Sequence, residues 1–189
     1  NLVQKTDANG NTTIYEYDRF DNMISETDHL GNKKTYVYDL LNRLIEKKDS
    51  YGNVIERLEY DEQGRQTKSI DANNNSIKYE YDKVDNVVKI IDELESVETF
   101  EYDANYNKTK HTDKNGNVTK YEYDNKNNLT KVTNALNENT LYEYDNAGNV
   151  TKLTDGKGNI TRYEYDKSSN ETKKIDQLGN EEVKVYDKN

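Results

Sequence analysis

The 189-residue sequence contains no cysteine, no proline and no tryptophan, and few of its residues are apolar. Without cysteine the chain cannot form a disulfide, so its stability has to come from noncovalent contacts. The absence of proline is compatible with long stretches of paired strand, because proline removes a donor from a sheet ladder. No run of 18 apolar residues is present, so we expect no membrane-spanning helix.

Composition by itself is typical of a disordered chain. Hydrophobic residues make up 31% of the sequence, charged residues make up 34%, and the formal net charge is -10 at pH 7. Chains of low hydrophobicity and high net charge bury too little apolar surface to fold. We expect no nucleic-acid partner for so acidic a chain, since contacts to phosphates need positive charge.

A repeat of about 21 residues runs through the whole chain and overrides this expectation of disorder. The pair Tyr-Asp recurs at steps of 21 residues, with a single step of 22 between Tyr38 and Tyr60. We therefore predict a single array of about nine repeats over residues 1–189, without a separate cargo or catalytic domain. The tyrosines of the Tyr-Asp pairs, the second column, are Tyr17, Tyr38, Tyr60, Tyr81, Tyr102, Tyr123, Tyr144, Tyr165 and Tyr186. The first column, two residues earlier, contains Tyr15, Tyr36, Tyr79, Tyr121, Tyr142 and Tyr163.

Two turn motifs per repeat separate short segments of β-forming residues. Each motif reads Asp, two variable residues, then Gly, Asn or Asp, then Asn or Arg, as in residues 145–149, and 17 such motifs occur. The fourth position favours residues that tolerate a left-handed backbone, which predicts a type I turn capped by Asp and closed by a G1 bulge. Eight of the nine glycines occupy it: Gly10, Gly31, Gly52, Gly64, Gly116, Gly148, Gly158 and Gly179.

Four turns depart from the motif. Glu95, Tyr106 and Ser169 occupy the left-handed position, where a side chain is costly, and we expect local loosening around Glu95 and Tyr106. Asn134 replaces the leading Asp in another turn, although an asparagine can still cap it.

The segments between turns are five to seven residues long, which suits strands and is too short for helices. We predict an all-β fold of tandem β-hairpin repeats, forming one long antiparallel meander of about eighteen strands that curls or spirals into a shell-like sheet. The end strands, residues 2–6 and 181–186, are expected to be unpaired, and such open edges invite self-association.

An odd repeat length requires one extra residue in each repeat. Without it, a 21-residue step would turn each tyrosine to the opposite face of the sheet. The turn spacing places the extra residue in or beside the tyrosine strand, where a bulge or longer loop would keep all tyrosines on one face. The 22-residue repeat predicts a second bulge between Asn53 and Tyr60.

Both tyrosine columns are predicted to line the covered face of the sheet, near Met23, Leu44, Val87 and Leu129. The opposite face would carry the glutamates between the tyrosines. A row of lysines in the alternate strands could lie on either face, depending on the bulge. Its members are Lys68, Lys89, Lys110, Lys131, Lys152 and Lys173.

The repeat resembles a known family. Tyr-x-Tyr-Asp-x-x-Gly-Asn, followed by Leu/Val-x-Lys-x-x-Asp-x-x-Gly-Asn-x-Thr, is similar to the YD repeat of the RHS family, found in bacterial polymorphic toxins, insecticidal toxin-complex subunits, wall-associated proteins and teneurins. The resemblance spans all 189 residues. It implies a β-sheet that spirals into a hollow shell, which encloses a polypeptide cargo in toxins or supports adhesion in teneurins. The proline-containing self-cleaving segment of the family is not present in this sequence.

By this resemblance the chain is a non-enzymatic slice of a shell that encloses or presents a polypeptide cargo of a secreted or cell-surface bacterial protein. The implied partners are flanking RHS repeats and a C-terminal toxin or other cargo. The alternative is an adhesion or cell-wall-binding module whose tyrosine columns stack on a glycan of the cell surface. Short hairpin repeats that bind choline in this way rely on tryptophan, which is absent.

We predict no enzymatic activity, no metal site and no cofactor. A calcium ion needs six to eight oxygens, and one Asp per turn, with neighbouring turns roughly 9.5 Å apart, does not supply them. His29 and His111 lack a phased partner, and no nucleophile, phosphate loop or metal-ligand cluster occurs.

Overall fold

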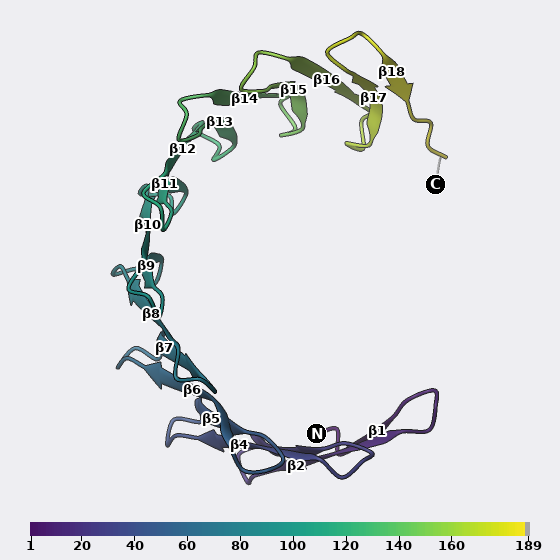
Figure 1. Cartoon of the computed structure of the whole chain (residues 1–189). Helices are drawn as coiled ribbons and strands as arrows, with labels where there is room; N and C mark the ends of the chain where they lie inside the picture. The colour runs from purple at the N-terminus through teal and green to yellow at the C-terminus, as the bar shows by residue number, and fades with distance from the viewer. Residues whose placement is uncertain (188–189) are drawn as a thin grey trace. The chain divides into compact units, whose positions relative to one another are not determined.

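The computed structural model describes residues 1–187, and the chain divides into two compact units, Asn1–Val97 and Glu98–Asn189, here called unit 1 and unit 2. Both units consist of short antiparallel strands joined by tight turns, and the described residues contain no helix. Figure 1 shows the strands of each unit following one another in chain order along a path that bends within the unit. The predicted all-β fold of tandem hairpins is therefore confirmed.

The strands match the segments between the predicted turns. Unit 1 contains β1 (Gln4–Thr6), β2 (Thr12–Tyr17), β3 (Met23–Thr27), β4 (Lys33–Tyr38), β5 (Leu44–Lys48), β6 (Val54–Tyr60), β7 (Gln66–Asp71), β8 (Ser76–Tyr81) and β9 (Val87–Ile91). Unit 2 follows with β10 (Val97–Tyr102), which starts at the boundary, β11 (Lys108–Thr112), β12 (Val118–Tyr123), β13 (Leu129–Thr133), β14 (Asn139–Tyr144), β15 (Val150–Thr154), β16 (Ile160–Tyr165), β17 (Glu171–Ile175) and β18 (Glu181–Val183).

Every predicted turn has the left-handed residue at its fourth position. The eight motif glycines have φ between 82° and 90°, and nine further residues take φ between 59° and 68°. Glu95, Tyr106 and Ser169 are among them, and the amide of each still donates to the carbonyl of the leading Asp at 3.1 Å. The turns at Glu95 and Tyr106 thus keep the common geometry, and the loosening that we expected there is not seen.

In most turns the leading aspartate accepts three hydrogen bonds. In the turn at Asp145, Oδ1 accepts the amides of Ala147 and Asn149, and Oδ2 accepts the Asn149 side chain, all at 2.9 Å. Asn134 caps its own turn in the same way, since its Oδ1 accepts the amides of Leu136 and Glu138 at 2.9 Å. Aspartate capping, predicted from the motif, is confirmed.

The extra residue of each repeat lies just after the Tyr-Asp turn. In the β12–β13 hairpin Glu122 pairs with Lys131 while Tyr123 pairs with Leu129, so Thr130 bulges out of the register. The bulge is therefore in the strand that follows the tyrosine strand, beside the tyrosines. The second bulge of the 22-residue repeat is confirmed at Ile55, because Lys47 pairs with Glu56 and Lys48 with Val54.

The end strands differ from the prediction. They are shorter than expected, and neither is unpaired, because β1 pairs with β2 and β18 pairs with β17. Within the described chain neither strand has a hydrogen-bonded neighbour on its outer side. β18 ends just before Lys184, which stands where all but one of the other repeats have a tyrosine or phenylalanine.

The sheet has no fully buried apolar side chain among the described residues. The most buried side chain is Ser25, which is 1% exposed and donates to Glu16 Oε2 at 2.5 Å. With a single layer of strands, stability depends on the ladders, the turns and the contacts that side chains make along each face.

Candidate functional site

The two faces of the sheet differ in chemistry. One face, called the tyrosine face, carries both tyrosine columns and the residues paired with them. Met23, Leu44, Val87 and Leu129 pair directly with second-column tyrosines, as predicted. The opposite face, called the charged face, carries the glutamates that alternate with the tyrosines, which are exposed.

The lysine row lies on the charged face, which settles the position that the sequence left open. Lys131 pairs with Glu122, and its Nζ lies 2.9 Å from Glu122 Oε1. The same pairing recurs at Lys110–Glu101 and Lys152–Glu143, at 2.8 and 2.7 Å. These ion pairs are open to solvent, so each contributes little to stability.

Within each unit, second-column tyrosines connect a repeat to the residues that precede it by about 15 positions. The Tyr144 hydroxyl donates to the carbonyl of Leu129 at 2.7 Å, and the Tyr38 hydroxyl donates to that of Met23 at 3.0 Å. Met23 lies two residues beyond the β3–β4 register, which ends at the Ser25–Thr35 pair. The hydroxyl thus satisfies a carbonyl where the two strands separate. The other members of this hydroxyl ladder are Tyr17–Leu2, Tyr60–Leu44, Tyr81–Gln66, Tyr123–Lys108, Tyr165–Val150 and Tyr186–Glu171.

Burial raises the pKa of several ladder phenols above the usual range. The group comprises Tyr38, Tyr60, Tyr81, Tyr123, Tyr144 and Tyr165. In the first column, burial and the hydrogen bond from the Tyr36 hydroxyl to Glu26 Oε2 at 3.1 Å raise the pKa of Tyr36 to about 12. These phenols are protonated donors at neutral pH.

The predicted tyrosines are half-buried with one exception. Both columns from Tyr15 to Tyr165 are of intermediate exposure, whereas Tyr186, after β18, is 44% exposed. Tyr51 and Tyr106, which belong to neither column, project from turns and are 88% and 60% exposed. The predicted glycines all lie at turn positions, away from the tyrosine face.

In part of unit 1 the residues in line with the first-column tyrosines on the neighbouring strands, here called the middle positions, are charged. Tyr36 pairs with Lys47, and Lys47 pairs with Glu56 and makes an ion pair with it at 2.5 Å. Glu26, beside Tyr15 in the register, accepts the Tyr36 hydroxyl.

The same positions are uncharged in the central part of unit 2. Tyr121 pairs with Val132, which pairs with Thr140. Tyr142 pairs with Leu153 in the next repeat, and Leu153 pairs with Thr161. The residues paired with Tyr121 and Tyr142 are therefore aliphatic and carry no charge, although Lys108 Nζ lies 5.0 Å from the centroid of the Tyr121 ring.

His111 occupies this middle position in the first repeat of unit 2. Its ring stacks on Phe100 with centroids 4.9 Å apart. Its Nε2 is buried without a hydrogen-bond partner, 3.9 Å from Glu98 Oε2. Phe100 stands at a first-column position, and the sequence gives no sign of this stack, because the pairing of Phe100 with His111 depends on the bulged register.

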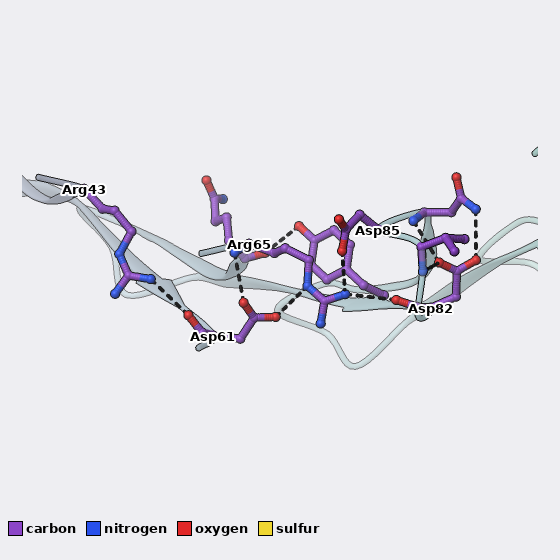
Figure 2. Close-up of polar contacts among 9 residues, drawn as sticks. Arg43, Asp61, Arg65, Asp82 and Asp85 are labelled. Atoms are coloured by element: carbon purple, nitrogen blue, oxygen red, sulfur yellow. Dashed lines mark hydrogen bonds and ion pairs between the residues drawn. The ribbon is translucent and has the colours of Figure 1, made fainter. Parts of the chain in front are cut away.

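Two arginines join neighbouring Tyr-Asp turns in unit 1, and Figure 2 shows them in line. Arg43 binds its own Asp39 at 2.7 Å and donates to the Asp61 carbonyl of the next turn at 2.9 Å. Arg65 in turn binds Asp61, the Asp82 carbonyl and Asp85 Oδ1 at 2.7, 2.9 and 3.0 Å (Figure 2).

Each guanidinium also lies 4.8 Å from the centroid of the following tyrosine, Tyr60 or Tyr81. Other turns use asparagine for the same connection, as in Asn107 Nδ2 to Asn127 Oδ1 at 2.9 Å. Sequence reasoning missed these links, which join residues 17 to 20 positions apart in neighbouring Tyr-Asp turns.

The described residues hold no group of three or more His, Asp or Glu side chains arranged for a metal ion. Turn aspartates instead direct both carboxylate oxygens at their own turn. Over residues 1–187 we also find no helix with the length and apolarity to cross a membrane.

Comparison with known families gives the repeat its name. The family described as RHS Repeat matches residues 1–31, 60–97, 81–118, 109–138, 123–160 and 144–181. This chain belongs to the RHS repeat family. The matches at residues 60–97, 81–118, 123–160 and 144–181 each extend over nearly two of the 21-residue units.

Solved structures with a similar fold include Tc toxin proteins. The crystal structure of TcdB2-TccC3-TEV is 18% identical with a TM-score of 0.51, over 87% of this RHS chain and 9% of that chain. The Photorhabdus luminescens Tc holotoxin pore is 15% identical with a TM-score of 0.40, over 87% of this chain and 13% of that one. The chain thus spans about a tenth of these proteins. None of the curated proteins matches it.

Proposed function

We propose that this chain is a non-enzymatic section of an RHS-type β-shell, whose tyrosine face is turned toward a polypeptide cargo. The observation that carries the proposal is the hydroxyl ladder. Within each unit it joins neighbouring repeats through the second-column tyrosines, over many strands. Such a surface can be lengthened by adding repeats, which suits a wall more than a single binding site.

Several features support a structural role over an enzymatic one. The carboxylates that recur in the chain are committed to turn hydrogen bonds or to lysine pairs. Catalysis requires a nonrepeating set of groups converging on one point. The partners that we propose are flanking RHS repeats and a cargo segment, in a protein that is secreted or displayed on a bacterial surface.

The orientation of the tyrosine face can be tested by site-specific photocrosslinking. A photoreactive phenylalanine analogue would replace Tyr142 on the tyrosine face or Glu143 on the charged face, in an RHS polypeptide that carries this array together with its cargo. The two positions are adjacent in sequence and differ in the face from which they project. Crosslinks to the cargo from position 142 alone would support the proposal, and crosslinks from position 143 alone would refute it.

A second candidate function is glycan binding by the tyrosine columns at a cell surface. It is favoured by the half-buried state of the rings, because an exposed ring face can stack on a sugar. Binding of the isolated chain to a peptidoglycan or glycan array, lost on replacing Tyr121 and Tyr142 by leucine, would support this function over the shell.

A further inference from the structure

The charged face of unit 2 carries a hollow whose lining is unusual for so acidic a chain. It has a volume of about 480 Å³ and lies between the midway turns that begin at Asp113 and Asn134. Its lining contains two lysines and no carboxylate: Lys110, Gly116, Asn117, Val118, Lys120, Thr133, Asn134, Ala135 and Asn137. A comparable hollow beside the Asp176 turn includes that aspartate, and another includes Asp7 and Glu26.

The lysines come from adjacent strands and face each other. Lys110 of β11 pairs directly with Lys120 of β12, which pairs with Thr133 of β13. Lys110 is held by Glu101 at 2.8 Å, whereas Lys120 makes no hydrogen bond or ion pair within residues 1–187. Like charges directly opposite each other destabilise a sheet. An anion bound between the two lysines would therefore stabilise this arrangement.

The missing carboxylate results from Asn134. All sixteen other turns begin with Asp, and this one begins with Asn, which makes the same two capping bonds without a negative charge. The turn does contain an acid, Glu138, whose Oε2 accepts the Asn134 side chain at 2.7 Å. Glu138 lies toward the following midway turn, where a Cβ placed on Gly156 would come within 2.9 Å of the Glu138 Cβ.

Gly156 is the one glycine outside the left-handed turn positions, and its lack of a side chain makes room for Glu138. Asn134 thus presents a neutral side chain to the hollow, while the acid of this turn, Glu138, is absent from its lining and packs against Gly156. Amide donors remain at the hollow, since the side chain of Asn137 makes no hydrogen bond among the described residues and Asn117 uses one donor on Asp113.

We propose that this hollow binds an oxyanion, a carboxylate or phosphate group carried by a small ligand such as a sugar acid. Lys120 supplies the unpaired charge, Lys110 the second cation, and the amides of Asn117 and Asn137 the neutral donors. The volume is within the range of small-molecule sites and exceeds what a bare phosphate needs. The site lies on the charged face, so it is independent of the function proposed for the tyrosine face.

The test is an NMR titration of ¹⁵N-labelled protein with inorganic phosphate, glucuronate and neutral glucose, at constant ionic strength set with sodium chloride. We expect saturable shifts at the amides of Asn117, Lys120 and Asn137 with one or both anions and none with glucose. A response to phosphate alone or to glucuronate alone identifies which oxyanion is bound. Absence of saturable shifts with either anion would overturn the proposal.

Two variants make the test specific. The double variant Asn134→Asp with Glu138→Asn restores the Asp and Asn pair of most other midway turns and returns a carboxylate to the lining, so affinity should fall by roughly threefold or more. Lys120→Gln should weaken binding by about threefold to tenfold. Lys126→Gln makes the same charge change at a Tyr-Asp turn and serves as the matched control. Equal affinity for wild type and the double variant, or equal losses in Lys120→Gln and Lys126→Gln, would contradict the site.

Discussion

The tyrosine faces of unit 1 and unit 2 have the same turns, bulges and hydroxyl ladder. They differ in the residues that pair with the first-column tyrosines. In unit 1 the middle positions include Glu26, Lys47 and Glu56, which bind one another or Tyr36. In the central part of unit 2 the corresponding residues are Val132 and Leu153, whereas its last repeat has Lys174 and Glu182 there. The repeat therefore needs its turns and ladder tyrosines, while the middle positions are free to suit whatever contacts that stretch of the face.

Acid should have the largest effect, and it should affect both units alike. The pKa of fifteen turn aspartates is lowered, in most of them chiefly by the side-chain hydrogen bond from the asparagine that ends the turn. A lowered pKa stabilises the fold above the unfolded-state value of about 4, and this stability is lost as pH falls through the folded-state values.

Thermal melts followed by circular dichroism should therefore show a constant midpoint from pH 7 to about 5 and a steep decline below about 4. NMR signals of both units should disappear together in this range. Acid unfolding of one unit well before the other would show that the turns do not stabilise the two units equally.

A charge in the middle of the unit 2 face should be the next most harmful change. Val132→Lys places an unpaired ammonium between Tyr121 and Thr140 and should cost about 1–2 kcal/mol in the free energy of unfolding. The double variant Val132→Lys with Thr140→Glu recreates the Lys47–Glu56 pair of unit 1 and should recover part of the loss. Urea denaturation measures both. A double variant no more stable than Val132→Lys would show that the unit 1 pair depends on its own surroundings.

Removal of ladder hydroxyls should have similar effects in both units. Tyr38→Phe and Tyr144→Phe each lose one hydrogen bond to a backbone carbonyl and should each cost about 1 kcal/mol. Tyr142→Phe is the control, because the hydroxyl of this first-column tyrosine makes no hydrogen bond to a described residue. Urea denaturation would contradict the ladder if all three variants were as stable as wild type.

The smallest effects are expected at the left-handed turn positions. Tyr106→Gly removes a side chain from a residue with φ of 66° and should stabilise the fold by about 0.5–1 kcal/mol. Gly148→Ala makes the opposite change at φ of 90° and should destabilise it by about 1 kcal/mol. The two melting midpoints should move in opposite directions, and a lower midpoint for Tyr106→Gly would reveal a contact made by that exposed ring.

Much of the fold could be predicted from sequence because the repeat encodes it locally. The left-handed residue and the aspartate cap depend on a few neighbouring residues, and the bulge at Ile55 follows from the length of its 22-residue repeat. The face of the lysine row could not be predicted, because the exact bulge position decides whether Lys131 lies on the same face of the sheet as Glu122 or on the opposite face.

The ladder and the turn-to-turn links were also missed. They join residues 15 to 20 positions apart, such as Tyr144 to Leu129 and Arg65 to Asp85, whose proximity depends on how neighbouring hairpins separate. Likewise the Glu138–Gly156 contact joins two turns that are adjacent only once the strands are paired.

The most direct test of the account is a residue-by-residue titration of the phenols by NMR, with ¹³C-labelled tyrosine and the denatured chain as reference. If the hydroxyl ladder makes the tyrosine face a structural surface, the ladder tyrosines Tyr38, Tyr81, Tyr123 and Tyr144 should titrate above 10. Tyr36 should titrate near 12. The fold should then lose stability as pH rises through these values, because raised phenol pKa values favour the folded state only while the phenols are protonated. Ladder tyrosines that titrate at 10 in the folded chain, as in the denatured reference, would contradict the account.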